Sequence, residues 1–188
     1  MIKTLSDLFY RYSRGWLIVA LLLIFVGFVA LTLPGLTAVS QNIEGLDTQF
    51  FYTPPQAFAN VAAYSNEARA AINRFHLTAD IINPILYSTL LALLLSWLFR
   101  RSFMAAPGRR LLNVFPLGAL LFDVLENISI TVLMTAYPAQ PAWVAWMATI
   151  STMFKFSILY ASLVLVLIGM VGALLARFGK VAAQPVQK

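Results

Sequence analysis

Apolar residues fill four segments of the chain, each close to or above the roughly 20 residues that a helix needs to cross a bilayer. The segments are Trp16–Leu33, Ile81–Phe99, Leu111–Ala136 and Trp143–Ala176. This pattern predicts an all-α integral membrane protein, with a single membrane domain over residues 1–188 built as a bundle of four transmembrane helices. The fourth segment is longer than a bilayer requires, and we expect it to tilt or to project into the cytoplasm.

The segment 34–80, between the first two spans, predicts an outer loop followed by an outer amphipathic helix. Turn-forming residues fill its first half, and Pro54-Pro55 suits a helix start. From Gln56 to Asp80 alanine is frequent and glycine is absent. We expect this helix to be continuous with the second span. The aromatic run Phe50–Tyr52 is expected at the headgroup level or packed over the bundle as a roof.

A polar stripe is predicted along one face of that continuous helix, because its members are separated by alternating steps of four and three residues. They are Arg69, Asn73, His76, Asp80, Asn83 and Tyr87. The last two lie inside the second span, where a merely solvated face is a poor explanation. Pro84 cannot donate to the Asp80 carbonyl, so this carbonyl is a candidate cation or hydrogen-bond site.

The third span carries Asp123, Glu126 and Asn127, which the helical repeat places on one face. A charge at the bilayer centre costs at least about 2.5–3.5 kcal/mol, so these acids need a partner. Lys155 of the fourth span is expected at a common depth, because the short connection 137–142 makes the two spans antiparallel neighbours. We expect one polar site, open towards the outside. Its catalytic candidates are Asp123, Glu126, Lys155 and His76, and its ligand-binding candidates are Asp80, Asn83, Tyr87, Asn127, Arg69 and Asn73.

The two acids and one lysine leave one negative charge unbalanced. One carboxyl can hold a proton, a metal or sodium ion can bind, or a cation of the outer helix (Arg69, Arg74 or protonated His76) can reach down. His76, Asp80, Glu126 and Asp123 would make an oxygen-rich divalent site. A lone histidine is a weak metal signal, however, and we expect no metal and no cofactor. The structural alternative is that these polar groups only stabilise the packing of the helices through hydrogen bonds and ion pairs.

Composition supports the membrane class and excludes others. Hydrophobic residues make up 61% and charged residues 11% of the chain, against about 45–50% and about 25% in soluble domains. An ordinary soluble globule and a disordered chain are both excluded. The absence of cysteine excludes disulfides, thiolate metal sites and paired-cysteine oxidoreductases.

The basic residues predict the topology. Ten of the thirteen lie in the N-terminal segment, the connection between the second and third spans, and the C-terminal tail, with Asp7 as the only acid there. Both termini are therefore expected in the cytoplasm of a cell whose inner or plasma membrane the chain crosses four times. The net charge of +6 then reflects topology and not a nucleic-acid partner. Lys3, Arg11 and Arg14 also resemble the start of a signal peptide, but the apolar run is too long for one, so we expect an uncleaved helix.

Three functions remain open. The first is binding or processing of a lipid-like small molecule, for example an acid–base isomerisation or hydrolysis, with membrane lipids as neighbours. The second is proton- or cation-coupled transport, and the third is non-catalytic assembly with a membrane partner protein. Small-residue steps such as Gly169-xxx-Ala173 leave a homodimer open. The chain has no Gly-x-Ser-x-Gly, His-Glu-x-x-His or phosphate-loop motif.

Overall fold

The computed structural model describes residues 1–40, 43–102 and 108–182. The protein is all-helical, with 84% of its residues in helices and no strand in the described ranges. In chain order the elements are α1 (Ile2–Tyr12), α2 (Gly15–Val39), η1 (Leu46–Thr48), α3 (Pro54–Ala63), α4 (Asn66–His76), α5 (Ala79–Phe99), η3 (Arg109–Val114), α6 (Leu117–Ala136) and α7 (Ala142–Ala182), where η marks a 3₁₀-helix.

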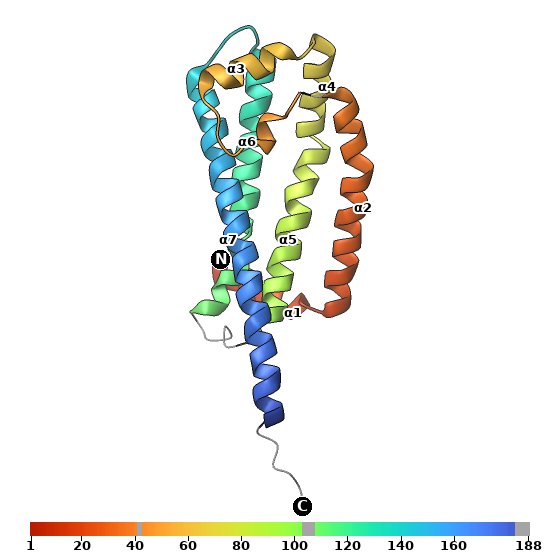
Figure 1. Ribbon diagram of the computed structural model, residues 1–188, viewed down its shortest axis with the longest axis vertical. Helices are drawn as coiled ribbons and strands as arrows, with labels where there is room; N and C mark the ends of the chain where they lie inside the picture. Colours follow the sequence, from red (N-terminus) through yellow and green to blue (C-terminus); the bar gives the residue numbers. More distant parts are fainter. Residues whose placement is uncertain (41–42, 103–107, 183–188) are drawn as a thin grey trace, which may run out of the picture.

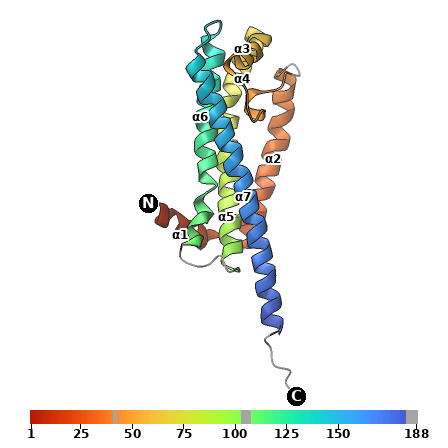
Figure 2. The same cartoon turned by 60° about the vertical axis from the view of Figure 1, so that its left-hand side comes forward.

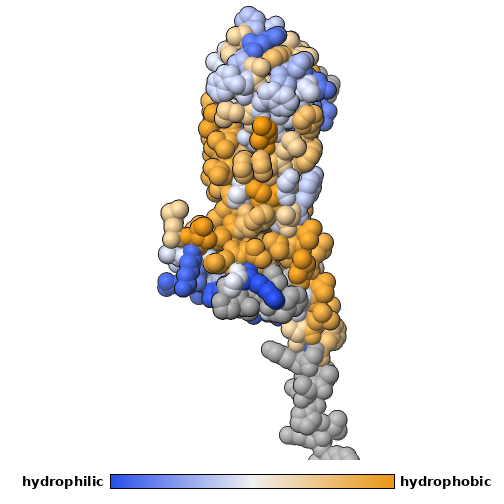
Figure 3. All heavy atoms as spheres, turned by 90° about the vertical axis from the view of Figure 1, so that its left-hand side faces the viewer, coloured by the Kyte–Doolittle hydropathy of each residue, from blue (hydrophilic) through white to orange (hydrophobic). Residues whose placement is uncertain are grey.

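Four helical segments are long and apolar enough to cross a membrane, as the sequence predicts: Gly15–Val39, Asn66–Phe99, Arg109–Ala136 and Ala142–Phe178. They form an elongated bundle (Figure 1), in which α5, α6 and α7 pack on one another and α2 packs on α4 and α5. The side in Figure 3 shows a broad apolar belt between two hydrophilic ends. The protein is a multi-pass membrane protein. The end of the bundle at which α3 lies is called the α3 end, and the opposite end, at which α1 lies, is called the α1 end (Figure 1).

The first span is longer than predicted. Residue 34 was expected to begin a loop, but α2 runs through Pro34 and ends at Val39. A proline removes one backbone hydrogen bond from a helix, and membrane helices tolerate this loss better than soluble ones do.

The prediction of one continuous helix from Gln56 into the second span is wrong, and the first break lies at Tyr64 and Ser65. The Ser65 side chain caps α4 by accepting from the Ala68 N–H at 3.2 Å. Arg69 Nη1 donates to the Val61 carbonyl in the last turn of α3 at 3.0 Å and to the carbonyl of Tyr64, the residue after this helix. A positive charge is favourable there because helix C-termini carry partial negative charge.

A second break separates α4 from α5 at Leu77 and Thr78. Thr78 Oγ1 donates to the Arg74 carbonyl at 2.6 Å. Side-chain bonds of this kind compete with the regular backbone ladder. The break is short enough that His76 and Asp80 still meet on the same side of the chain, at 2.8 Å.

The last two spans also differ from the prediction at their ends. The third begins as η3, and the α-helix starts at Leu117 after Pro116, a residue that suits a helix start and not an interior. The fourth span is contained in the 41-residue helix α7, about 60 Å long. Its C-terminal part extends beyond the rest of the bundle (Figure 1), and this accounts for the excess length of the span.

Helix α1 was not predicted. It lies across the end of the bundle and not along it (Figure 2). Its buried Ser6 donates to Asn113 Oδ1 at 2.7 Å, and Asn113 Nδ2 donates to Ser96 Oγ at 2.8 Å, which ties α1, η3 and α5 together. Asp7 pairs with Arg110 at 3.1 Å.

The apolar core has two parts, one at each end of the bundle. At the α3 end, buried residues of η1, α3, α4, α6 and α7 pack around Tyr52 and Leu46. At the α1 end, Leu95, Leu98 and Phe99 pack with Tyr10 and Val166. Asp80, Asp123, Glu126 and Lys155 lie in sequence between members of these two clusters.

Candidate intramembrane polar site

Glu126 and Lys155 form an ion pair between α6 and α7. The Glu126 side chain is fully buried, and Lys155 Nζ donates to Oε2 while Thr152 Oγ1 donates to Oε1. Lys155 Nζ also donates to the Asp47 backbone carbonyl of η1 at 3.0 Å. The expected pairing of Lys155 with an acid of the third span is confirmed, and the acid is Glu126.

Asp123 is the acid left without a cation. It is 5% exposed, and its Oδ2 accepts from the Tyr87 hydroxyl at 2.9 Å while its Oδ1 accepts from Asn127 Nδ2 at 3.4 Å. The salt bridges among the described residues do not include it. The unbalanced negative charge that the sequence indicates therefore falls on Asp123, where a proton or a bound cation can balance it.

Asp80 joins the two halves of the polar stripe to α6. Its Oδ2 lies 2.8 Å from His76 Nδ1, and its backbone carbonyl accepts from Asn127 Nδ2 at 3.3 Å. This is the carbonyl that Pro84 leaves without its helical donor. The prediction that it serves as a hydrogen-bond site is confirmed, with an asparagine of the third span as the donor.

A cavity of about 610 Å³ lies against these groups and changes character along its length. Towards the α3 end its lining is polar, and towards the α1 end it is apolar. The polar residues are Asp80, Asn83, Tyr87, Asp123 and Lys155, with Asp47 and Thr48 of η1. The apolar residues are Phe25, Leu90, Leu91, Phe156, Leu159 and Leu163. A space of this size and lining suits a small amphiphile.

The cavity faces the lipid side of the bundle. Phe25 comes from α2, which packs on α4 and α5, and the opposite wall comes from α7. Leu163 of that wall is 47% exposed, so the apolar half of the cavity reaches the surface that contacts hydrocarbon. A ligand can therefore enter sideways from the bilayer.

A second cavity, of about 260 Å³, lies on the other side of η1. Asp47 and Thr48 line both cavities. His76 lines the smaller cavity and Asp80 the larger one, so their 2.8 Å contact bridges the two spaces. A histidine and a carboxylate in contact can pass a proton between two compartments.

The other candidates are distributed as follows. Asn83 lines the large cavity, and its buried Oδ1 has no hydrogen-bond partner. Glu126 and Asn127 do not line the cavity. They bind residues that do, Glu126 through Lys155 and Asn127 through the Asp80 carbonyl. Arg69 and Asn73 lie outside it: the Arg69 guanidinium stacks 4.1 Å over the Tyr137 ring, and Asn73 Nδ2 donates to Thr135 Oγ1 at 3.1 Å.

The expected aromatic roof is only partly formed. Tyr52 is 1% exposed, its N–H donates to Thr149 Oγ1 at 3.1 Å, and burial raises the pKa of its phenol above the ordinary value. Phe50 and Phe51 remain about half exposed. The element that reaches the site is instead η1, which sequence reasoning missed. The turn formers around Asp47 were a signal for it, but its contact with Lys155 uses a backbone carbonyl, which any residue has.

No three histidine, aspartate or glutamate side chains come together as metal ligands in the part of the chain that the structure describes. The divalent site considered for His76, Asp80, Glu126 and Asp123 is thus not formed. Comparison of the chain with protein families, with curated proteins and with solved structures finds no match in any of the three. The case for function therefore depends on the site itself.

Proposed function

We propose that this protein binds or processes a lipid-like amphiphile in the 610 Å³ cavity between α2, α5 and α7. The observation that carries the proposal is the position of Asp123, a buried carboxylate without a cation, at the polar end of a cavity whose other end is apolar. An amphiphile places its polar head against such groups and its chain along the leucines. We further propose that both termini are cytoplasmic and that the polar end of the cavity lies towards the non-cytoplasmic side of a cell membrane.

The polar wall favours a head that donates hydrogen bonds or carries positive charge. Lys155 is already engaged by Glu126 and Asp47, so its charge is largely neutralised within the protein. What remains available is a set of acceptors, namely the carboxylates of Asp80 and Asp123 and the Asn83 amide oxygen, which has no partner. A long-chain amine supplies both charge and donors to this wall.

The same groups can support proton transfer on a bound substrate. Asp123 would act as the general acid or base, with the Tyr87 hydroxyl holding its carboxyl group in position. The His76–Asp80 contact would exchange protons with the smaller cavity. An isomerisation or a hydrolysis needs such groups, and binding alone needs only the acceptors.

Retention of dodecylamine by the purified protein tests the proposal. Native mass spectrometry from nanodiscs measures the bound fraction, with dodecanoate as the oppositely charged probe. Leu163→Trp fills the apolar half, and Leu167→Trp is the matched control, because Leu167 is 61% exposed on the same helix and does not line the cavity. We expect Leu163→Trp and Asp123→Asn to weaken dodecylamine binding at least about tenfold, and the control to leave it unchanged. Equal retention by all four proteins, or preference for dodecanoate, contradicts the proposal.

Transport of a proton or cation is the second candidate, because the His76–Asp80 contact joins two cavities. The apolar cluster of Leu95, Leu98 and Phe99 weighs against a path through the α1 end. Proteoliposomes with a trapped pH dye distinguish the two functions. A proton flux that His76→Gln abolishes favours transport, and an absent flux together with dodecylamine binding favours the amphiphile site.

A further inference from the structure

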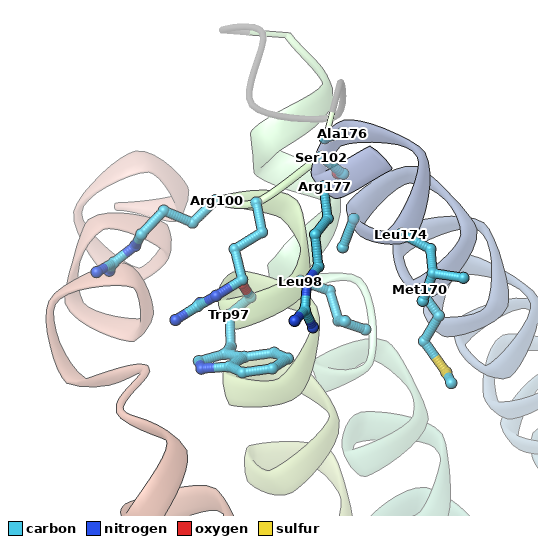
Figure 4. A pocket seen from close by; sticks show the side chains of 10 residues that line it. Trp97, Leu98, Arg100, Ser102, Met170, Leu174, Ala176 and Arg177 are labelled. Carbon is cyan, nitrogen blue, oxygen red and sulfur yellow. The ribbon is translucent and has the colours of Figure 1, made fainter. Parts of the chain in front are cut away.

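A further open cavity, of about 950 Å³, lies at the α1 end between the end of α5 and the C-terminal part of α7 (Figure 4). It shares no residue with the site described above. Its lining combines three arginines and a tryptophan with an apolar wall. The residues are Trp97, Leu98, Arg100, Arg101, Ser102, Met170, Ala173, Leu174, Ala176 and Arg177.

The cavity exists because α5 and α7 cross closely at Gly169 and separate beyond it. A Cβ atom at Gly169 would lie 3.0 Å from the Leu98 Cβ and 3.4 Å from Phe99 Cδ1. Past this crossing α7 continues away from the bundle, while α5 ends at Phe99 (Figure 1). The small side chains of Ala173 and Ala176 leave the space between the two helices open.

Among the residues that the structure describes, the arginines of this cavity have no carboxylate partner. No aspartate or glutamate occurs in residues 81–122 or 127–188, and the one acid at this end, Asp7, is paired with Arg110 at 3.1 Å. The unbalanced charge here is therefore positive, the reverse of the Asp123 site. An anionic ligand would compensate it.

Two of the arginines are held in place by the protein. Arg101 lies 4.0 Å over the Trp97 ring, and its Nη1 donates to the Trp97 carbonyl at 2.9 Å. Arg100 Nη2 donates to Ser13 Oγ at 3.0 Å. A guanidinium has five donors, so each still has several to offer, and fixed geometry lowers the entropic cost of binding.

The remaining wall suits an acyl chain. Met170 and Leu174 are 49% and 60% exposed, and Leu98 faces them across the cavity. Figure 4 shows the Arg177 side chain beside Leu98, with Met170 and Leu174 on α7. Arginines and a tryptophan beside apolar side chains are the combination that binds lipid at a membrane interface.

We infer that this cavity binds an anionic phospholipid of the surrounding bilayer. The guanidinium groups of Arg101, over Trp97, and of Arg177 bind its phosphate, and one acyl chain lies along Met170 and Leu174. The site differs from the Asp123 cavity in ligand charge and in the end of the bundle at which it lies. Its occupant is structural or regulatory and not the amphiphile proposed above.

The test compares lipid adducts of the full-length protein by native mass spectrometry from mixed micelles containing equal amounts of phosphatidylglycerol and phosphatidylcholine. We expect the wild type to retain phosphatidylglycerol at least about tenfold better, and the double variant Arg101→Gln/Arg177→Gln to lose this preference. Arg109→Gln is the matched control, because it removes an exposed arginine at the same end that does not line the cavity. We expect it to keep the preference.

Two further experiments distinguish a bound lipid from free phosphate as the ligand of this cavity. Ala173→Trp blocks the apolar wall without removing a charge, and we expect it to abolish phosphatidylglycerol retention as well. Inorganic phosphate at millimolar concentration is expected not to displace the lipid. Equal retention of both lipids by the wild type, or displacement by phosphate, overturns the assignment. If the arginine double variant does not fold, the wild-type lipid preference and Ala173→Trp still decide it.

Discussion

The Tyr87 hydroxyl of α5 donates to Asp123 Oδ2 of α6 across 2.9 Å, at the wall of the 610 Å³ cavity. Asp123→Asn keeps an acceptor for this hydroxyl and removes a charge that no cation of the described chain balances. We expect the free energy of unfolding to fall by less than about 1 kcal/mol or to rise, while dodecylamine binding is lost. Asp7→Asn, at an exposed salt bridge, is the control and should change neither quantity by much. A large loss of stability in Asp123→Asn would assign this residue a structural role.

The Glu126–Lys155 pair should behave in the opposite way, because each charge is buried against the other. Lys155→Met leaves Glu126 without its cation, and we expect it to cost about 3–5 kcal/mol. The double variant Glu126→Gln/Lys155→Met should recover most of this loss. Unfolding by sodium dodecyl sulfate in mixed micelles measures both quantities. Ser162→Ala, which removes a hydroxyl bonded only within α7, is the control. Additive losses in the double variant would show that the pairing is not the main role of Lys155.

Asn127 and Pro84 are coupled through the Asp80 carbonyl. Asn127→Leu removes the donor to a buried carbonyl, and we expect a loss of about 1–3 kcal/mol. Pro84→Ala restores a backbone N–H that can donate to the same carbonyl within α5. The loss caused by Asn127→Leu should therefore be smaller on the Pro84→Ala background. An equal loss on both backgrounds would mean that the freed carbonyl does not explain the contact.

The spans and the buried charges could be predicted because each depends on a local pattern. Apolar runs of the right length identify the helices, and helical spacing places Asp123 and Asn127 on one face. The breaks in the outer helix could not be predicted in this way. Ser65 and Thr78 end helices through hydrogen bonds that alternative backbones also allow, so their effect depends on tertiary packing.

The ion-pair partner of Lys155 could not be predicted from the sequence either. Asp123 and Glu126 lie one turn apart and both face the bundle, so spacing alone permits either to bind Lys155. Two further contacts favour the pair with Glu126: Thr152 donates to its other carboxylate oxygen, and the Asp47 carbonyl accepts a second hydrogen bond from Lys155. Helix α1 was missed because it is short and amphipathic, and the apolar runs that identify spans do not detect such helices.

The proposed topology can be tested with single cysteines, because the chain has none of its own. Lys3→Cys places a thiol on α1 and Glu67→Cys places one on α4, both at exposed positions of opposite ends. In sealed right-side-out vesicles, a membrane-impermeant maleimide should label Glu67→Cys and not Lys3→Cys. Both should react after the vesicles are opened with detergent. Labelling of Lys3→Cys alone in sealed vesicles would show that the orientation is the opposite of the proposed one.

Replacement by a larger residue should have opposite effects on stability at Gly169 and at Gly27. A Cβ at Gly169 would meet the Leu98 Cβ at 3.0 Å, whereas one at Gly27 would meet nothing within 4 Å. Both residues lie inside helices, where alanine is favoured over glycine by up to about 1 kcal/mol. Gly27→Ala should therefore stabilise the protein slightly. Gly169→Leu should cost about 1–3 kcal/mol, because α5 and α7 would have to move apart at their crossing. The same movement should weaken phosphatidylglycerol retention, since the crossing shapes the cavity beyond it. If Gly169→Leu is as stable as the wild type, then α7 does not depend on this close contact, and the cavity at the α1 end has another origin.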